Sequence, residues 1–140
     1  MSEPKFTIFR QYVKDISFES ILGHEMFTTQ WQPEIHVDIG VHHTHVEGDR
    51  FEVDLVVTVN LSMADKPAYL LEVNQAGLFD LAGIDGEELD RTLGILCPTM
   101  LYPYAREAID NIAVRAGSMP IGLQPINFEE LYTGSLAKTA

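Results

Sequence analysis

The residues in this sequence with the strongest potential for chemistry are histidines that lie close together. Three of them fall between His42 and His45, and His36 lies upstream. Imidazole is a common zinc ligand, and alternate histidines of a strand would share one face, to which Glu47 or Asp49 of the following turn could add a carboxylate. A metal-binding oligomer built on this hairpin is one interpretation. The other is a solvated loop that becomes more positive below neutral pH, and we favour it, with no metal bound.

A second candidate for chemistry is Cys97, at the start of a predicted helix, where the helix dipole would lower the pKa of a thiol. Its neighbours are apolar and the surrounding helix contains no histidine, so we predict a buried structural cysteine. The pair His24-Glu25 is not followed by a histidine at metalloprotease spacing, and no P-loop, dinucleotide-binding or Gly-x-Ser-x-Gly pattern occurs. We therefore predict no enzymatic activity, no catalytic residues and no cofactor.

The composition limits the class of protein. The chain has 140 residues, of which 46% are hydrophobic, and a formal net charge of -12, which predicts one acidic globular domain over residues 1–140. Excess carboxylates repel a phosphate backbone, so nucleic acid is a poor partner. The N-terminus lacks the apolar core of a signal peptide, and no apolar run approaches the roughly 20 residues of a membrane helix. A single cysteine cannot form an internal disulfide, which fits a reducing compartment. Together these features lead us to expect a cytoplasmic protein that does not insert into membranes.

The elements that would position functional residues begin with four stretches in which apolar and polar residues alternate, as in half-buried strands. A turn at residues 47–50 predicts that the second and third stretches form an antiparallel hairpin. The pattern predicts an α+β fold in which a four-stranded antiparallel meander is followed by C-terminal helices. The predicted strands cover residues 6–19, 35–41, 51–59 and 69–79.

The longest helical pattern runs from Asp85, which could cap the first turn, to Gly117, which could end the helix in a left-handed conformation. Pro98 and Pro103 interrupt it, so we predict a break or kink near residues 96–98 and a second near Tyr102. The apolar face is wide for one chain, which favours burial against a partner subunit. Asn127 could cap a last helix that carries Phe128, Leu131 and Tyr132 on one face.

Two surfaces follow from these elements. Leu70 and Glu72 share one face of the fourth predicted strand, and Asp15 and Glu19 would join them if the first strand lies in the same sheet. The result would be an acidic, partly apolar patch suited to a basic or metal-bearing partner. The loop at residues 118–125 is apolar and would be ordered by packing. Trp31, the single tryptophan, would either anchor a loop or form one wall of a binding groove.

Five motifs in this order resemble the SecB family of bacterial protein-export chaperones, over nearly the whole length. They are Lys14–Glu19, Trp31–Glu34, Glu72–Phe79, Cys97–Glu107 and Pro125–Phe128. The resemblance implies a SecB-like α+β fold assembled as a dimer of dimers, a homotetramer with helices sandwiched between sheets. It also implies an ATP-independent holdase that binds unfolded secretory preproteins and delivers them to the SecA motor ATPase of the Sec pathway. Many relatives carry a longer polar tail after the position of Leu136.

The resemblance also assigns residues. Residues implied to bind SecA are Asp15, Glu19, Leu70 and Glu72, and this contact should weaken with salt. Residues implied to bind clients in apolar grooves are Phe27, Trp31, Met119, Ile121 and Leu123. Residues implied to lie at the oligomer interface are Leu71, Val73, Gln75, Cys97, Leu101 and Tyr104. A relative's task of chaperoning one partner, such as an antitoxin, remains an alternative to general export.

Overall fold

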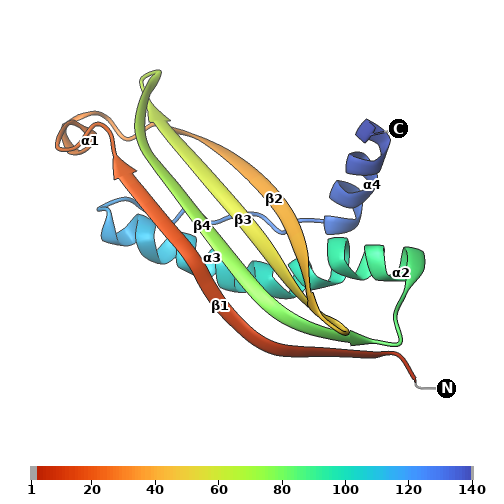
Figure 1. Ribbon diagram of the computed structural model, residues 1–140. Helices are drawn as coiled ribbons and strands as arrows, with labels where there is room; N and C mark the ends of the chain where they lie inside the picture. Colours follow the sequence, from red (N-terminus) through yellow and green to blue (C-terminus); the bar gives the residue numbers. More distant parts are fainter. Residues whose placement is uncertain (1–2, 140) are drawn as a thin grey trace.

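The computed structural model describes residues 3–139 of the chain, with side chains described through residue 134. A long curved sheet is covered on one face by a helical run (Figure 1). In chain order the elements are β1 (Lys5–Ser20), α1 (Glu25–Thr28), β2 (Pro33–Glu47), β3 (Arg50–Met63), β4 (Lys66–Ala82), α2 (Gly86–Arg91), the π-helical turn η1 (Thr92–Leu96), α3 (Cys97–Arg115) and α4 (Phe128–Thr139).

The sheet confirms the predicted α+β class and the four antiparallel strands, each somewhat longer than predicted. The strand order is β1-β4-β3-β2, so only β2, β3 and β4 form a meander. The first strand lies beside the last, because residues 21–32, which include α1, carry the chain from one edge of the sheet to the other. The alternation of residue types predicts that a segment is a strand but not which edge it joins, so the prediction of a four-stranded meander was wrong in this respect.

Two irregularities in β1 decide which of its side chains face the helices. The register with β4 shifts between Ile8 and Arg10 and again between Val13 and Asp15. Each bulge adds one residue and reverses the parity of the side chains that follow it. Ile8 pairs with a residue of the inner face, the face covered by α3, and so does Val13, although these two positions differ in parity. Lys14 is the extra residue of the second bulge.

The helical run packs on the inner face of β3 and β4. The side chains between the helices and these two strands form the core. The buried stripe of α3 comes from residues four apart, Cys97, Leu101, Ala105 and Ile109, as expected for one face of a helix. Near residues 96–98 the run changes from the π-helical turn η1 to α3, but Leu96 and Cys97 both keep a right-handed helical conformation, so the helical run is irregular there without being broken. No break occurs near Tyr102, because α3 continues through Pro103.

The helix ends follow two of the three predictions. Gly117 has φ 84°, and the N–H groups of Gly117 and Ser118 donate to the carbonyls of Val114 and Ala113, each at 3.0 Å, which is a Schellman ending. Asn127 Oδ1 accepts from the N–H of Glu130 at 3.1 Å and caps α4. The predicted cap by Asp85 was wrong, because its side chain makes no capping hydrogen bond.

Candidate functional site

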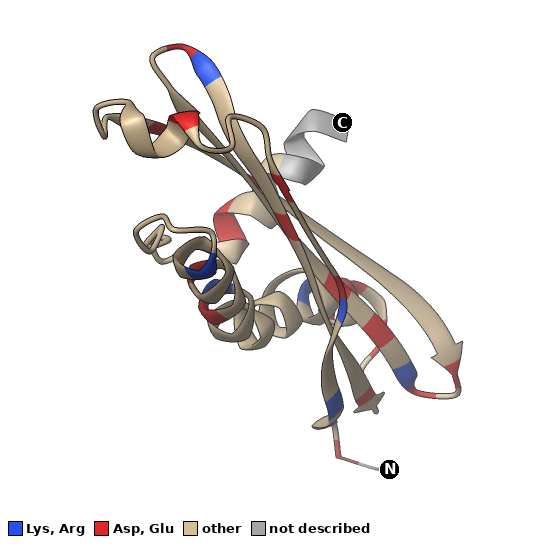
Figure 2. Cartoon of the chain, turned by 90° about the vertical axis from the view of Figure 1, so that its left-hand side faces the viewer, with Lys and Arg blue, Asp and Glu red and all other residues tan. Residues whose placement is uncertain are grey.

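The outer face of the sheet, the side away from α3, carries the predicted acidic patch. β1 and β4 pair so that Glu19 lies opposite Leu70 and Ser17 lies opposite Glu72. Directly paired residues project from the same face, so the structure brings Asp15, Glu19, Leu70 and Glu72 together, and we call these four residues the acidic face. Asp15 and Glu19 are exposed, whereas Leu70 and Glu72 are half-buried. Figure 2 shows that acidic positions recur along the strands, whereas basic positions are few.

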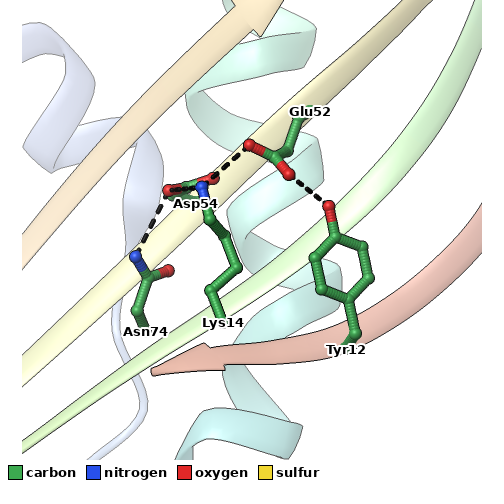
Figure 3. Close-up of polar contacts among 5 residues, drawn as sticks. All are labelled: Tyr12, Lys14, Glu52, Asp54 and Asn74. Atoms are coloured by element: carbon green, nitrogen blue, oxygen red, sulfur yellow. Dashed lines mark hydrogen bonds and ion pairs between the residues drawn. The ribbon is translucent and has the colours of Figure 1, made fainter. Parts of the chain in front are cut away.

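A polar network that the sequence did not predict borders the acidic face (Figure 3). Lys14 Nζ lies 2.9 Å from Glu52 Oε1 and 3.0 Å from Asp54 Oδ2, so a side chain from the β1 bulge reaches across β4 to β3. The Tyr12 hydroxyl donates to Glu52, and Asn74 Nδ2 donates to Asp54 at 3.3 Å. The bulge therefore places a lysine between two carboxylates.

Burial and hydrogen bonds within this network favour ionised Glu52, protonated Lys14 and neutral Tyr12 at neutral pH. The hydrogen bonds from Tyr12 and Lys14 lower the pKa of Glu52, and the hydrogen bonds to Glu52 and Asp54 raise the pKa of Lys14. Burial, followed by the bond to Glu52, raises the pKa of Tyr12 to about 12. Lys14 thus offsets one of the two negative charges that Glu52 and Asp54 place beside it. In the part of the chain that the structure describes, Glu72 and the acidic residues of β1 near it take part in no ion pair, so the acidic face keeps its negative charge.

The predicted client-binding residues separate into exposed and buried ones. Phe27 and Met119 are each 62% exposed, and Trp31 is 38% exposed. The Phe27 ring lies against Gly117, at 2.7 Å from the position that a Cβ of this glycine would take, so α1 is next to the C-terminal end of α3. Ile121 is half-buried, and Leu123 is buried at 6% exposure. Leu123 therefore anchors the loop to the core and does not present a surface to a client, contrary to the assignment.

Two exposed apolar residues near this end were missed. Phe18 is 38% and Ile21 is 49% exposed, and the Phe18 ring lies 5.3 Å from the ring of Tyr69. The Tyr69 hydroxyl is 3.2 Å from Ser118 Oγ, which connects β4 to the loop that follows α3. The alternation of β1 could have indicated Phe18 as an inner-face residue, but only the fold shows that the helices leave it uncovered.

The residues assigned to the oligomer interface are, with one exception, inside the chain. Each of the buried ones is at most 4% exposed, because it belongs to the layer between the sheet and α3. A residue enclosed in its own chain cannot contact a partner directly, which corrects the assignment as a contact surface. The buried residues are Leu71, Val73, Gln75, Cys97 and Leu101, and the exception is Tyr104, 53% exposed.

Cys97 is buried as predicted, and burial raises the pKa of its thiol to about 12, so it is not a thiolate at neutral pH. The histidine stretch forms the end of β2 and not a separate loop. His43 and His45 lie beside the ring of Phe51, with ring centroids 6.5 Å and 4.9 Å away. Among the residues that the structure describes, no group of three or more His, Cys, Asp or Glu side chains is arranged to hold a metal ion.

Within residues 3–139, no helix is long and apolar enough to cross a membrane. The fold is an α+β sheet with helices on one face, and it presents an acidic outer sheet face and exposed apolar side chains around the ends of α1 and α3. The protein family described as "Preprotein translocase subunit SecB" matches residues 1–139 of the chain. The chain is 42% identical over 138 residues to the protein-export protein SecB of Marinobacter nauticus, covering 98% of this chain and 83% of that protein.

Similarity to a second relative is comparable, with 38% identity over 136 residues to the protein-export protein SecB of Hahella chejuensis, covering 97% of this chain and 86% of that protein. The chain belongs to the SecB family, the export chaperones of the Sec pathway. Among solved structures, a Mycobacterium tuberculosis SecB-like chaperone in complex with an antitoxin peptide is similar in fold, with a TM-score of 0.70 and 16% identity over 86% of this chain and 90% of that chain.

Proposed function

We propose that this protein is an ATP-independent holdase of the cytoplasm that keeps secretory preproteins unfolded for export. The observation that carries the proposal is the exposure of Phe27, Trp31 and Met119, large apolar side chains that a folded chain would ordinarily bury. Phe18 and Ile21 extend the same apolar end of the molecule. Aromatic rings and a flexible methionine accommodate many different apolar side chains, which suits a binder of varied unfolded clients.

The acidic face is the proposed docking site for SecA. Its two exposed carboxylates, on β1, flank the half-buried Leu70 and Glu72, so a basic segment with an apolar residue would complement it. Thr58 Oγ1 donates to Glu72 at 3.0 Å and fixes the orientation of that carboxylate. Since the other charges are solvent-exposed, binding should weaken as ionic strength rises.

We further propose that the chain assembles as a dimer of dimers through surfaces other than the buried layer. Three exposed apolar residues of the helical run, Leu96, Met100 and Tyr104, follow one another at intervals of four and therefore form one stripe. The edge strand β1 exposes Val13 and Ile16 as well. Covering both surfaces with further copies of the chain would bury the apolar groups and satisfy the free edge of the sheet.

The test of the holdase is light scattering of a denatured, slow-folding secretory precursor diluted into buffer without ATP. The wild-type protein should suppress aggregation at about one assembly per client, and unrelated unfolded chains should compete. The variant Phe27→Ser combined with Met119→Ser should suppress less, whereas Glu107→Gln, on the exposed side of α3, should behave as wild type. No suppression by the wild type would refute the proposal, and protection of a single tight partner would identify a dedicated chaperone.

The test of SecA docking is the affinity of purified SecA for the charge-reversal variants Asp15→Lys and Glu72→Lys. Each should weaken SecA binding about three- to tenfold. Client binding should be unchanged, because the acidic face is on the side of the sheet away from α3. Glu87→Lys, at an exposed position of α2 outside the proposed interfaces, is the control for a change of the same charge elsewhere. Equal SecA affinity of wild type and variants would show that the docking site lies on another surface.

A further inference from the structure

The middle of the loop between α3 and α4 is held by one carboxylate of α3. Asp110, near the C-terminal end of α3, accepts hydrogen bonds at a single oxygen from two consecutive backbone N–H groups, Ile121 at 2.9 Å and Gly122 at 3.1 Å. Gly122 has φ 66°, in the left-handed region, and successive N–H groups converge on one anion in this kind of conformation. The loop thus forms an anion-binding turn whose anion is a side chain of its own chain.

The remaining anchors of the loop lie on both sides of this turn. Before it, the Tyr69 hydroxyl lies 3.2 Å from Ser118 Oγ. After it, the Tyr102 hydroxyl donates to the carbonyl of Gln124 at 2.5 Å, and Leu123 is buried in the core. The loop belongs to no sheet or helix, so these side-chain bonds replace the backbone ladder that regular structure would supply.

We propose that Asp110 is a positioning residue that holds Met119 and Ile121 in place for client binding. This inference rests on the proposed function. Met119, 62% exposed, lies between the Ser118 anchor and the Asp110 turn, and its backbone is therefore held at both ends. A surface that is ordered before binding loses less conformational entropy when a client binds, which raises affinity. The loop is thus a prearranged apolar surface, ordered by these side-chain hydrogen bonds in addition to the packing that its sequence predicts.

The first experiment measures hydrogen exchange of the wild-type protein and of Asp110→Ala without client. Loss of a charge-assisted hydrogen bond should raise exchange at the amides of Ile121 and Gly122 by about tenfold. Asp110→Asn retains an acceptor oxygen and should restore part of the protection. Glu107→Ala removes the same charge from an exposed position of α3 and should leave both amides as in wild type. Unchanged exchange in Asp110→Ala would overturn the proposal.

The second experiment measures the affinity of the same variants for reduced, carboxymethylated α-lactalbumin, a permanently unfolded probe. Asp110→Ala should bind about three- to tenfold more weakly, through faster dissociation, while its thermal midpoint falls by only a few degrees, as expected for the loss of these hydrogen bonds without unfolding of the domain. Gly122→Ala should act in the same direction, because alanine strains the φ of 66° although no heavy atom lies within 4 Å of its Cβ. Faster exchange with unchanged affinity would refute the positioning role. Failure of the wild type to bind any unfolded chain would instead refute the holdase, and the exchange result would still decide the role of Asp110.

Discussion

Gly77 of β4 is the position at which the packing of α3 on the sheet can be perturbed by a single carbon atom. A Cβ on this glycine would lie 2.7 Å from Phe79 Cε2 and 3.1 Å from Leu101 Cδ2. Phe79 and Leu101 are both 0% exposed, so neither the Phe79 ring nor the Leu101 side chain can move into solvent to make room. The absence of a side chain at Gly77 is therefore what allows the helix to approach the sheet closely.

The expected cost of Gly77→Ala follows from two opposing contributions. Overpacking a well-packed core costs about 1–3 kcal/mol, and replacing glycine in a strand recovers about 0.5–1 kcal/mol through the unfolded chain. The difference is about 0–2.5 kcal/mol, and we expect a net loss in free energy of unfolding in the upper half of this range, because a Cβ 2.7 Å from a buried ring lies well inside contact distance. Chemical denaturation followed by circular dichroism, at one protein concentration for all variants, measures it.

Gly40→Ala is the matched control, since a Cβ at Gly40 of β2 meets only His42 Nε2, at the ordinary contact distance of 3.5 Å. This control should be as stable as wild type or slightly more so. Leu101→Ala combined with Gly77→Ala should be less destabilised than the sum of the two single changes, because removing the leucine relieves the overlap. Wild-type stability of Gly77→Ala, or equal destabilisation of Gly40→Ala, would refute the packing argument.

Three further predictions concern other parts of the chain. Hydrogen bonds, of which the one from Tyr12 has the largest effect, lower the pKa of Glu52 below its ordinary value of 4.5. The stability that ionised Glu52 contributes is therefore present above about pH 4.5 and is lost as the pH falls through the pKa of the folded state. Glu52→Gln should be less stable than wild type at pH 7, and its stability should depend less on pH during acid denaturation. Burial raises the pKa of Cys97 to about 12, so a thiol reagent at pH 8 should label it only at the rate of unfolding, and rapid labelling would contradict this. In Gly94→Ala a Cβ would lie 2.6 Å from Tyr132 Cδ1, so amide exchange in α4 should rise while the sheet stays protected.

The sequence determined the elements and the family because both depend on local patterns. Alternation in β3 and β4 and four-residue spacing in α3 correspond directly to the pleat of a strand and the turn of a helix. The ending at Gly117 and the cap at Asn127 depend on the conformational freedom of one residue and the short side chain of another. Ordered motifs along the chain sufficed to predict the SecB family, which the comparisons confirm.

The acidic face could be predicted from the sequence only in part. Its members on β4, Leu70 and Glu72, share a face by strand parity alone, and the sequence predicts this much. Their proximity to Asp15 and Glu19 depends on β1 pairing with β4, and also on the bulge at Lys14, which restores the parity needed to turn both carboxylates outward. Strand order and bulges arise from contacts between distant segments, so no local pattern reports them.

What only the tertiary structure decided is which side chains remain available. Leu71 and Leu101 are apolar, as an interface residue would be, yet they are buried where the sheet packs against α3. Phe27 and Met119 are also apolar and remain exposed. The sequence records hydrophobicity, but burial depends on what packs against each residue. The carboxylate of Asp110 bonded to the turn at Gly122 has the same origin, because a side chain and backbone groups 12 residues apart meet only after the loop has folded back onto α3.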